Sequence, residues 1–236
     1  MSKEFEQDIF EFHIRKTNKT IRIKYNEHCP VTKYSEFLIS NFPDVENKSV
    51  IDLGAGSGVL SILSFLLGAN SVKAVEKNPN CMGIAMENIQ QNDATVNLLS
   101  SDEIESSSKD LLGTADIIIS NPASLPNIVN KDYCNAGEYG LEMIFDLIYL
   151  AEKKLNQNGS LYFIQTSIIP FSLVNNLLKE KGFHYEIIKT SKLLFREFYS
   201  PLIPWIKKNE KKYSEMYYHN IEGQFYEELM LYKATK

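Results

Sequence analysis

Apolar and polar positions alternate first in a short N-terminal stretch. Over residues 9–25, apolar side chains recur at every second position on both sides of a polar turn, which predicts a β-hairpin. An irregular connector follows, and the apolar positions of residues 33–41 then recur at helical spacing. We therefore expect residues 1–47 to form a hairpin-and-helix segment, the N-terminal arm, ahead of a larger domain.

From residue 48 onward, short apolar runs alternate with stretches of helical period. The predicted strands cover residues 49–53, 72–75, 96–99, 116–120, 160–165, 183–188 and 225–233. The predicted helices cover residues 59–67, 81–91, 141–155 and 171–181, and Asn158 with Gly159 is expected to end the third of them. Strands separated by helices of this length predict an α/β fold with a doubly wound, mostly parallel, seven-stranded sheet. We assign this sheet to one domain, residues 48–236, with a long insertion over 189–224 before the last strand.

Three alternating glycines follow the first strand of this domain. Gly54, Gly56 and Gly58 come directly after the acidic Asp52 and its neighbour, and a second apolar run follows them. Glycine permits a sharp turn and the close approach of a ligand, and the next helix would offer free N–H groups. The spacing is not the dinucleotide fingerprint, because Val59 occupies the place of its third glycine, and the lysine of a phosphate loop is absent. An acid at this position suits a ligand that carries a cation.

This turn resembles motif I of the class I S-adenosylmethionine (SAM) methyltransferases, an acid-x-G-x-G-x-G pattern. Residues 117–122 resemble motif IV of the N-methyltransferases with the "small" methyltransferase domain, a group that includes protein-glutamine N5-methyltransferases and enzymes that methylate exocyclic amines of adenine or guanine. Asn121 and Pro122 match its Asn/Asp-Pro-Pro-aromatic motif, whereas Ala123 and Ser124 replace the second proline and the aromatic residue. Further similar segments are Val75–Pro79, Glu87-Asn88, Gln91–Asp93 and Gly140–Glu142. The resemblance spans roughly residues 28–165.

The resemblance implies a Rossmann-like methyltransferase fold, SAM as cofactor, S-adenosylhomocysteine as product, and methyl transfer to nitrogen. In that family the Asn oxygen and the Pro carbonyl accept hydrogen bonds from an NH2 group, so Asn121 and Pro122 are the expected catalytic residues. The expected cofactor-binding residues follow the predicted strands, where ligands bind in such sheets. They are Asp52, Gly54, Ala55, Gly56, Gly58, Glu76, Lys77, Ser101, Asp102 and Asn121.

Two acidic residues have separate expected roles in this set. Glu76 ends the second strand 24 residues after Asp52, where a carboxylate can accept both hydroxyls of a ribose. The ribose-binding acid of dinucleotide folds lies at a similar distance along the sequence, so Glu76 alone does not distinguish SAM from a dinucleotide. Asp102 follows the third strand and could accept from the exocyclic amine of adenine, with Ser101 and Glu103 as competitors for that role.

The acceptor is less well defined by the sequence. Residues 189–212 carry seven basic and two acidic side chains, interleaved with aromatic residues, in a chain of net charge −5. This segment either forms a solvated face or contacts an anionic substrate or partner. We expect the insertion and residues 9–35 to form the acceptor walls, and the N-terminal arm to act as a lid. The expected substrate-binding residues are Ser124, Tyr133, Tyr139 and Trp205.

The acidic balance and the missing aromatic favour a small-molecule or protein acceptor over an RNA base. A SAM-binding regulatory or scaffold subunit without activity is an alternative of another class, and a nicotinamide-binding protein is disfavoured by the glycine spacing. The three scattered cysteines and four histidines form no metal-ligand or disulfide pattern. No apolar run reaches the roughly 18–20 residues of a membrane helix, and the N-terminus is too acidic for a signal peptide. The sequence thus predicts a cytoplasmic, metal-free protein and leaves the oligomeric state open.

Overall fold

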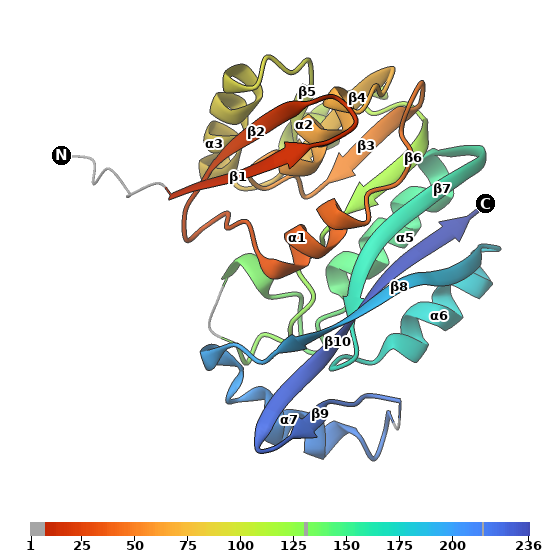
Figure 1. Cartoon of the computed structure of the whole chain (residues 1–236). Coiled ribbons are helices and arrows are strands. Elements are labelled where there is room, and N and C mark those ends of the chain that lie inside the picture. The colour runs from red at the N-terminus through yellow and green to blue at the C-terminus, as the bar shows by residue number, and fades with distance from the viewer. Residues whose placement is uncertain (1–7, 130–131, 214) are drawn as a thin grey trace. The chain divides into compact units, whose positions relative to one another are not determined.

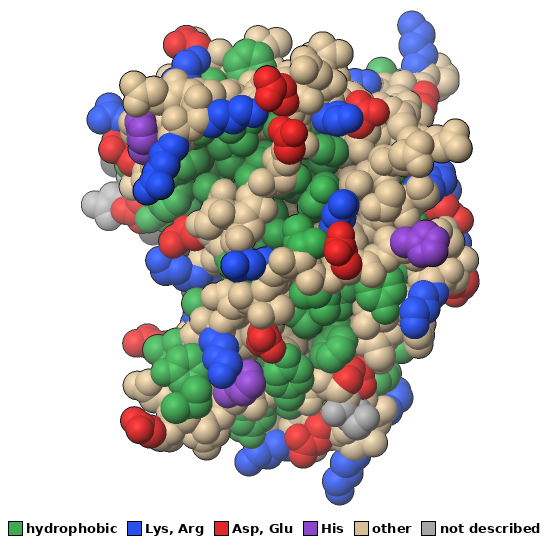
Figure 2. All heavy atoms as spheres, turned by 45° about the vertical axis from the view of Figure 1, so that its right-hand side comes forward, with side chains coloured by type: hydrophobic (Ala, Val, Ile, Leu, Met, Phe, Trp, Pro, Cys, Tyr) green, Lys and Arg blue, Asp and Glu red, His purple; other side chains and the backbone are tan. Residues whose placement is uncertain are grey.

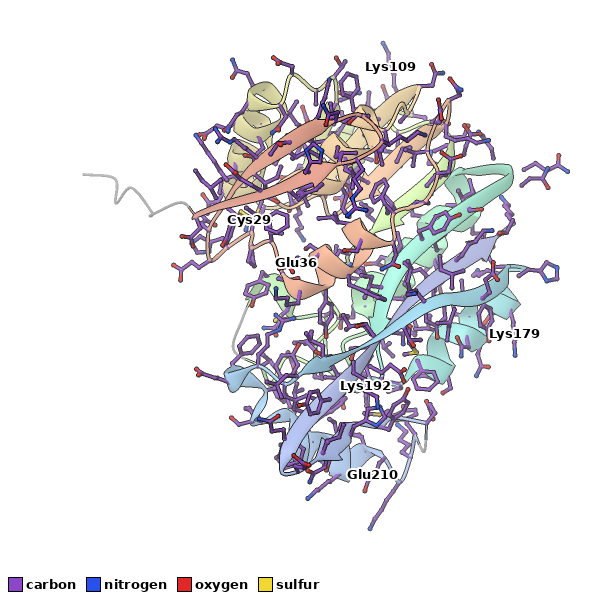
Figure 3. All side chains as sticks on the ribbon, in the orientation of Figure 1. Cys29, Glu36, Lys109, Lys179, Lys192 and Glu210 are labelled. Atoms are coloured by element: carbon purple, nitrogen blue, oxygen red, sulfur yellow. The ribbon has the colours of Figure 1, made fainter. Side chains whose placement is uncertain are left out.

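The N-terminal arm forms the hairpin and helix that the sequence predicts. The computed structural model describes residues 8–129, 132–213 and 215–236. Strands β1 (Asp8–Ile14) and β2 (Lys19–Tyr25) pair antiparallel, and helix α1 (Lys33–Ser40) follows the connector (Figure 1). Cys29 lies on that connector and Glu36 on α1 (Figure 3). Ile21 and Ile23 of β2 are fully buried, so the alternation of the sequence becomes one buried face of the hairpin.

The backbone divides into two units, each described here by itself. The first comprises Met1–Asn121 with Lys154–Gly159, and the second comprises Pro122–Lys153 with Ser160–Lys236. Besides the hairpin, the first unit contains the strands β3 (Ser49–Leu53), β4 (Ser71–Glu76), β5 (Asn97–Ser100) and β6 (Ala115–Ser120). Its further helices are α2 (Val59–Leu66), α3 (Pro79–Gln91) and α4 (Ser101–Ser106).

Within the central sheet, four strands run parallel in the order β5-β4-β3-β6. The chain moves outward from β3 through β4 to β5 and then returns to the other side of β3 as β6. This reversal beside β3 is the topological switch point at which parallel sheets bind ligands. The residues predicted to bind a ligand at the ends of β3 and β6 therefore lie on neighbouring strands.

Local sequence explains where α3 begins. Asn78 caps the helix by accepting the backbone N–H of Asn80 at 3.0 Å, and Pro79 stands in the first turn, where a missing N–H is harmless. The helix then buries Cys81, Ile84, Ala85 and Asn88. Asn88 is the unusual member of this buried face, because an amide there must find hydrogen-bond partners.

In the second unit, β10 (Gln224–Thr235) runs antiparallel between β7 (Leu155–Thr166) and β8 (His184–Leu194). Its helices are α5 (Glu142–Lys154), α6 (Phe171–Glu180) and α7 (Leu202–Asn209). The short β9 (His219–Ile221) also pairs with β10, and two 3-10 turns cover Asp132–Cys134 and Glu197–Tyr199. The fold class is confirmed: a mostly parallel central sheet with flanking helices and an antiparallel N-terminal hairpin.

Two sequence-based expectations were wrong in detail. Asn158 and Gly159 do not end a helix, because α5 stops at Lys154 and β7 begins at once. Asn158 takes a positive φ of 63° inside the strand, and a Cβ on Gly159 would lie 3.0 Å from the Asp116 carbonyl oxygen. A close backbone approach, and not a helix cap, therefore explains the glycine.

The strand predicted at residues 183–188 is also longer than expected. β8 continues to Leu194, and most of its residues are exposed. The polar residues 189–192 gave no apolar alternation, but their backbone pairs with β10 across a register shift between Leu231 and Tyr232. The rest of the insertion contains α7 and β9.

Charges of both signs are spread over the surface. On the face in Figure 2, Lys and Arg side chains are interspersed with Asp and Glu. No helix in the described ranges is both long enough and apolar enough to cross a bilayer. Within the same residues, His, Cys, Asp and Glu side chains form no group of three suited to a metal ion.

Candidate active site

The glycine turn joins β3 to α2 with three residues of positive φ. Gly54, Gly56 and Gly58 have φ values of 74°, 55° and 81°, which favour glycine over any residue with a Cβ. The N–H groups of Gly54 and Ala55 both donate to the Val75 carbonyl of β4, at 2.9 and 3.0 Å. The turn is thereby fixed to the neighbouring strand, and its outer part is free to face a ligand.

Gly56 and Gly58 need glycine for different reasons. A Cβ built on Gly56 meets nothing within 4 Å, so the missing side chain leaves open space above the turn. A Cβ on Gly58 would lie 3.4 Å from the Cβ of Ala85, so this glycine lets α3 approach closely. Gly58 is also the N-cap of α2 and gives no side-chain cap to its first N–H groups. The turn therefore combines an open cradle with helix N–H groups.

Glu76 at the end of β4 binds the turn through its carboxylate. Oε2 accepts the N–H of Gly56 at 2.7 Å, and Oε1 accepts those of Lys77 and Asn78, both at 2.8 Å. A carboxylate offers about four acceptor positions, and backbone donors occupy three of them here. Lys77 itself is exposed. Glu76 thus shapes the turn as well as marking the expected ribose position.

Asp52, in β3 two residues before Gly54, is fully buried. Its Oδ2 accepts the hydroxyl of Ser61 at 2.5 Å, whereas its Oδ1 has no hydrogen-bond partner among the described residues. Desolvation by burial raises the pKa of Asp52 to about 7, although the Ser61 hydroxyl opposes the rise and the nearby Glu76 adds to it. A carboxyl group in this state is one that a neighbouring cation would ionise.

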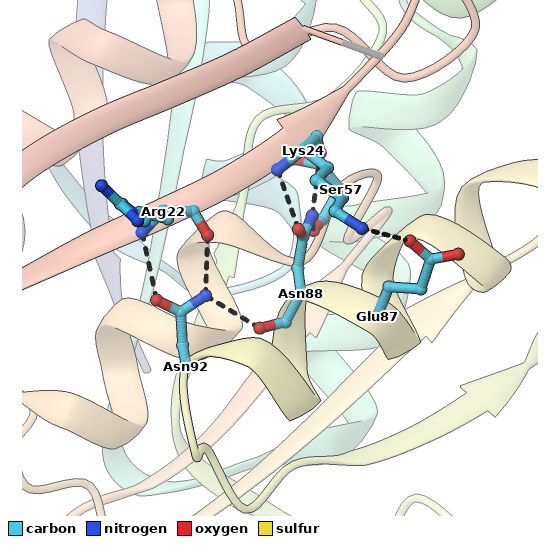
Figure 4. Close-up of polar contacts among 6 residues, drawn as sticks. All are labelled: Arg22, Lys24, Ser57, Glu87, Asn88 and Asn92. Carbon is cyan, nitrogen blue, oxygen red and sulfur yellow. Dashed lines mark hydrogen bonds and ion pairs between the residues drawn. The ribbon is translucent and has the colours of Figure 1, made fainter. Parts of the chain in front are cut away.

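Asn88, which the sequence analysis gave no role, connects the turn to the N-terminal arm (Figure 4). Its Oδ1 accepts the N–H of Lys24, and its Nδ2 donates to the carbonyls of Lys24 and Ser57, each at 2.8 Å. One helical turn later, Asn92 makes the corresponding pair of bonds to the backbone of Arg22, at 3.1 and 2.8 Å. Lys24 Nζ also donates to Glu87 at 3.0 Å. Helix α3 therefore holds both β2 and the Ser57 carbonyl of the glycine turn.

The end of β5 is shaped by a helix cap. Ser100 caps α4, and Glu103 closes the capping box by accepting the Ser100 N–H at 2.7 Å. The Glu103 carboxylate therefore already accepts a hydrogen bond, and this backbone donor of Ser100 lowers the pKa of Glu103. Ser101 is half-buried, and Asp102 is exposed, as is Glu103.

Asn121 follows β6, and its carboxamide contacts the N-terminal arm. Nδ2 of Asn121 donates to Oγ of Ser35 in α1 at 3.0 Å. The preceding Ser120 donates its hydroxyl to the Leu53 carbonyl at 2.7 Å, which ties the end of β6 to the end of β3. The sequence gave no signal for these contacts of Ser35 and Ser120, because each joins residues far apart in the sequence.

Beyond Asn121 the chain enters the second unit. Pro122 and Ser124 are buried, and the N–H of Ala123 donates to the sulfur of Met143 at 3.3 Å. A Cβ on Gly140 would come within 2.7 Å of the Ser124 carbonyl oxygen, which explains the glycine before α5. Ser124, at the position of the family's aromatic residue, thus lies inside this packed segment.

The remaining candidate substrate residues join an aromatic cluster in the second unit. The ring of Tyr139 lies 6.1 Å from that of Trp205 and 5.6 Å from that of Tyr213, between centroids. Lys212 Nζ lies 5.3 and 4.9 Å from the Tyr139 and Tyr213 rings. Tyr133 contacts Arg196, and burial raises the pKa of its hydroxyl. The structure therefore brings Tyr139 and Trp205 together and gives Tyr133 a separate basic neighbour.

These residues fit SAM on their own chemistry. The cradle over Gly56 gives room for a ligand, and Glu76 retains acceptor capacity toward a hydroxyl. The buried Oδ1 of Asp52, without a hydrogen-bond partner among the described residues, would be stabilised as an anion by a ligand cation. The site belongs to a βα turn at a switch point, where the class I methyltransferases hold their cofactor.

Comparison with known proteins supports the same class. Residues 28–193 match the family described as "Methyltransferase small domain". A Methanocaldococcus jannaschii protein, provisionally named a protein N5-glutamine methyltransferase, is 31% identical over 185 residues, which cover 74% of this chain and 92% of the relative. A ribosomal protein L11 methyltransferase of Thermotoga petrophila is 35% identical over 92 residues, which cover 39% of this chain and 33% of that protein.

A solved structure shares the fold at low sequence identity. The 16S rRNA N2 G1207 methyltransferase of T. thermophilus, in complex with AdoMet and guanosine, has a TM-score of 0.59 and 17% identity. The match covers 98% of this chain and 50% of that one. The chain belongs to the methyltransferase small-domain family. It is a SAM-dependent methyltransferase, and the nicotinamide-binding alternative is thereby excluded.

Proposed function

We propose that this methyltransferase modifies a nitrogen of a protein side chain, and that the acceptor is a planar amide such as that of glutamine. The observation that carries the proposal is the fixed carboxamide of Asn121, bonded through its nitrogen to Ser35. A carboxamide that donates through Nδ2 presents Oδ1 as an acceptor on its other branch. The name of the Methanocaldococcus jannaschii relative supports an amide as the target.

In this proposal the chain itself contributes position and hydrogen bonding. Oδ1 of Asn121 and the carbonyl of Pro122 accept the two N–H groups of the target, which turns the nitrogen lone pair toward the methyl carbon. SAM supplies a methyl group activated by its sulfonium and leaves as S-adenosylhomocysteine. The N–C bond forms as the C–S bond breaks, and the target nitrogen then loses a proton. Holding the reacting atoms in line is worth about 7–11 kcal/mol in well-oriented systems.

We also assign acceptor binding to the aromatic cluster of Tyr139, Trp205 and Tyr213 with Lys212. The three rings are half-buried, and Lys212 lies over two of them. Lys207, Lys208 and Lys211 are exposed nearby in the sequence, and none of the described ion pairs includes them. Such a surface suits an acidic protein segment with apolar side chains. In the same proposal the N-terminal arm is the lid, and residues 189–224 form the substrate-side insertion.

An RNA base is the second candidate acceptor, favoured by the same exposed lysines. Two observations argue against it. The rings of the cluster pack against each other at 55° and 78°, so they do not form a stacked platform for bases. The chain as a whole carries a net charge of −5.

The test is transfer of label from methyl-labelled SAM into a cell extract divided into protein, RNA and small-molecule fractions. We expect label in protein, released by acid hydrolysis as methylamine, because a methylated amide yields methylamine whereas methylated lysine or arginine survives. Asn121→Ala should bind SAM within a few-fold of the wild type and transfer no label above background. Label in RNA alone, or in methylated lysine, would refute the amide proposal.

A further inference from the structure

Ser35 is an unexpected neighbour of Asn121. It belongs to α1 in the N-terminal arm, yet its Oγ accepts the Asn121 Nδ2 at 3.0 Å across 86 positions of sequence. Ser35 is only 5% exposed, so water competes little for this bond. The contact joins the arm directly to the residue that, in the proposed function, receives the acceptor N–H.

The Ser35 hydroxyl is itself held in place. Ser35 is the third residue of α1 and part of its capping box: Oγ accepts the backbone N–H of Thr32 at 3.3 Å, and the Ser35 N–H donates to Thr32 Oγ1 at 3.4 Å. A hydroxyl oxygen has two acceptor positions, and the Thr32 N–H and the Asn121 Nδ2 occupy both. In this arrangement the Ser35 oxygen is the acceptor and the Asn121 carboxamide nitrogen is the donor.

The carboxamide of an asparagine has little intrinsic preference between two orientations. The final torsion of Asn is broad and close to two-fold, so rotation by half a turn exchanges the oxygen and the nitrogen at little intrinsic cost. In one orientation the acceptor NH2 meets an oxygen, and in the other it meets a second donor and is repelled. The Ser35 oxygen that accepts from Nδ2 favours the first orientation, because the second would require the hydroxyl to turn and donate to Oδ1.

We propose that Ser35 is a positioning residue for methyl transfer: it holds the Asn121 carboxamide with Oδ1 toward the acceptor nitrogen. The inference rests on the proposed function of Asn121. The arm that carries Ser35 is fastened to α3 by Asn88 and Asn92, and Asn88 also holds the glycine turn. Helix α3, which supports the cofactor turn, therefore also anchors the arm whose Ser35 orients the Asn121 amide.

A purely structural role for Ser35 would act through the helix cap. Thr32→Ala removes the Oγ1 acceptor of the cap but keeps the backbone N–H that binds Ser35 Oγ, so the contact with Asn121 remains. Loss of such a cap costs about 0.5–2 kcal/mol. Thr32→Ala is thus the matched control for Ser35→Ala.

The experiment compares wild type, Ser35→Ala, Thr32→Ala, Asn121→Ala and the double variant of Ser35 and Asn121. The probe is methyl-labelled SAM with the protein fraction of a cell extract, and the readouts are maximal rate, KM for SAM, SAM affinity and Tm. We expect Ser35→Ala to lower the maximal rate at least tenfold with SAM affinity within twofold. Thr32→Ala should lower Tm and keep the maximal rate within twofold. In the Asn121→Ala background, Ser35→Ala should have no further effect.

The possible failures are distinguishable. A wild-type rate in Ser35→Ala, beside a low rate in Asn121→Ala, would overturn the role of Ser35 and leave the proposed function intact. An equal loss of rate in Thr32→Ala would show that the helix cap, and not the contact with Asn121, is what matters. A wild-type rate in Asn121→Ala would overturn both proposals.

Discussion

Glu76 and Gly56 are joined by a 2.7 Å hydrogen bond from the glycine N–H to the carboxylate Oε2. The end of β4 thereby fixes the glycine turn that follows β3, in addition to the carbonyl of Val75 that holds Gly54 and Ala55. The residue expected to bind the cofactor ribose is also a structural support of the cofactor turn, which makes its substitution informative in two ways.

Replacing Glu76 should weaken SAM binding through both roles. Glu76→Ala leaves three backbone N–H groups without their acceptor, so we expect at least a tenfold loss of SAM affinity, about 1.4 kcal/mol, by calorimetric titration. Glu76→Gln keeps one acceptor oxygen and should lose less. Unchanged affinity in Glu76→Ala would mean that the cofactor does not bind at this turn.

Asp52 should make the protein less stable as the pH rises. An exposed Asp has a pKa near 3.9, whereas burial raises the pKa of Asp52 to about 7. Between about pH 4 and 7 the folded state holds a proton that the unfolded state has released, so the free energy of unfolding falls with rising pH, by up to roughly 4 kcal/mol. Asp52→Asn should remove this fall.

The measurement is urea unfolding of wild type and Asp52→Asn at pH 5 and pH 8. The other titrating groups are common to both proteins, so the difference between their pH dependences isolates Asp52. We expect the variant to be the more stable protein at pH 8. The same pH dependence in both proteins would contradict the raised pKa.

Substitutions of Asn88 and Asn92 should distinguish the hydrogen bonds that hold the N-terminal arm from the one that holds the glycine turn. Both bind the backbone of β2, but Asn88 alone also binds the Ser57 carbonyl of the glycine turn. Asn88→Ala should cost roughly 1–3 kcal/mol of stability, because buried partners lose their bonds, and should weaken SAM binding several-fold. Asn92→Ala should lower Tm and leave SAM affinity within twofold. Equal SAM affinity in the two variants would refute a role of Asn88 in the turn.

The variant Gly56→Ala tests whether SAM occupies the open space above the turn. Gly182, which follows α6, has a φ of 76° and, like Gly56, would meet nothing within 4 Å of an added Cβ. Both Ala variants should therefore cost a similar 1–2 kcal/mol from backbone strain, measured by urea unfolding. Only Gly56→Ala should lower SAM affinity, because only its Cβ would enter the cofactor space. Equal affinity in both variants would place the ligand elsewhere.

Local patterns predicted the elements and the turn well. The apolar alternation over residues 9–25 and the glycine spacing depend on residues close in sequence, and the structure confirms both. The capping box that involves Glu103 at the end of β5 is also a local pattern.

Long-range amide contacts could not be predicted in this way. Asn88 bonds Lys24 across 64 positions, and Asn121 bonds Ser35 across 86. A buried Asn in a helix and a Ser in a helix cap each have ordinary local explanations, so nothing in the sequence says that they meet a distant backbone or side chain. The extension of β8 was missed for a related reason, since pairing with β10 fixes a strand that lacks apolar alternation.

The pair of asparagines on α3 also affects how the arm meets other protein chains. Four residues of a helix rise about 6.0 Å, and two residues of a strand about 6.6 Å, so amides one turn apart match alternate residues of β2. Lys24 and Arg22 thus have their outward N–H and C=O groups bonded by side chains, as a third strand would bond them. An unprotected strand edge invites pairing with another chain and aggregation. The asparagines of α3 occupy the free edge of β2, so the two-stranded hairpin resists the addition of a third strand at that edge.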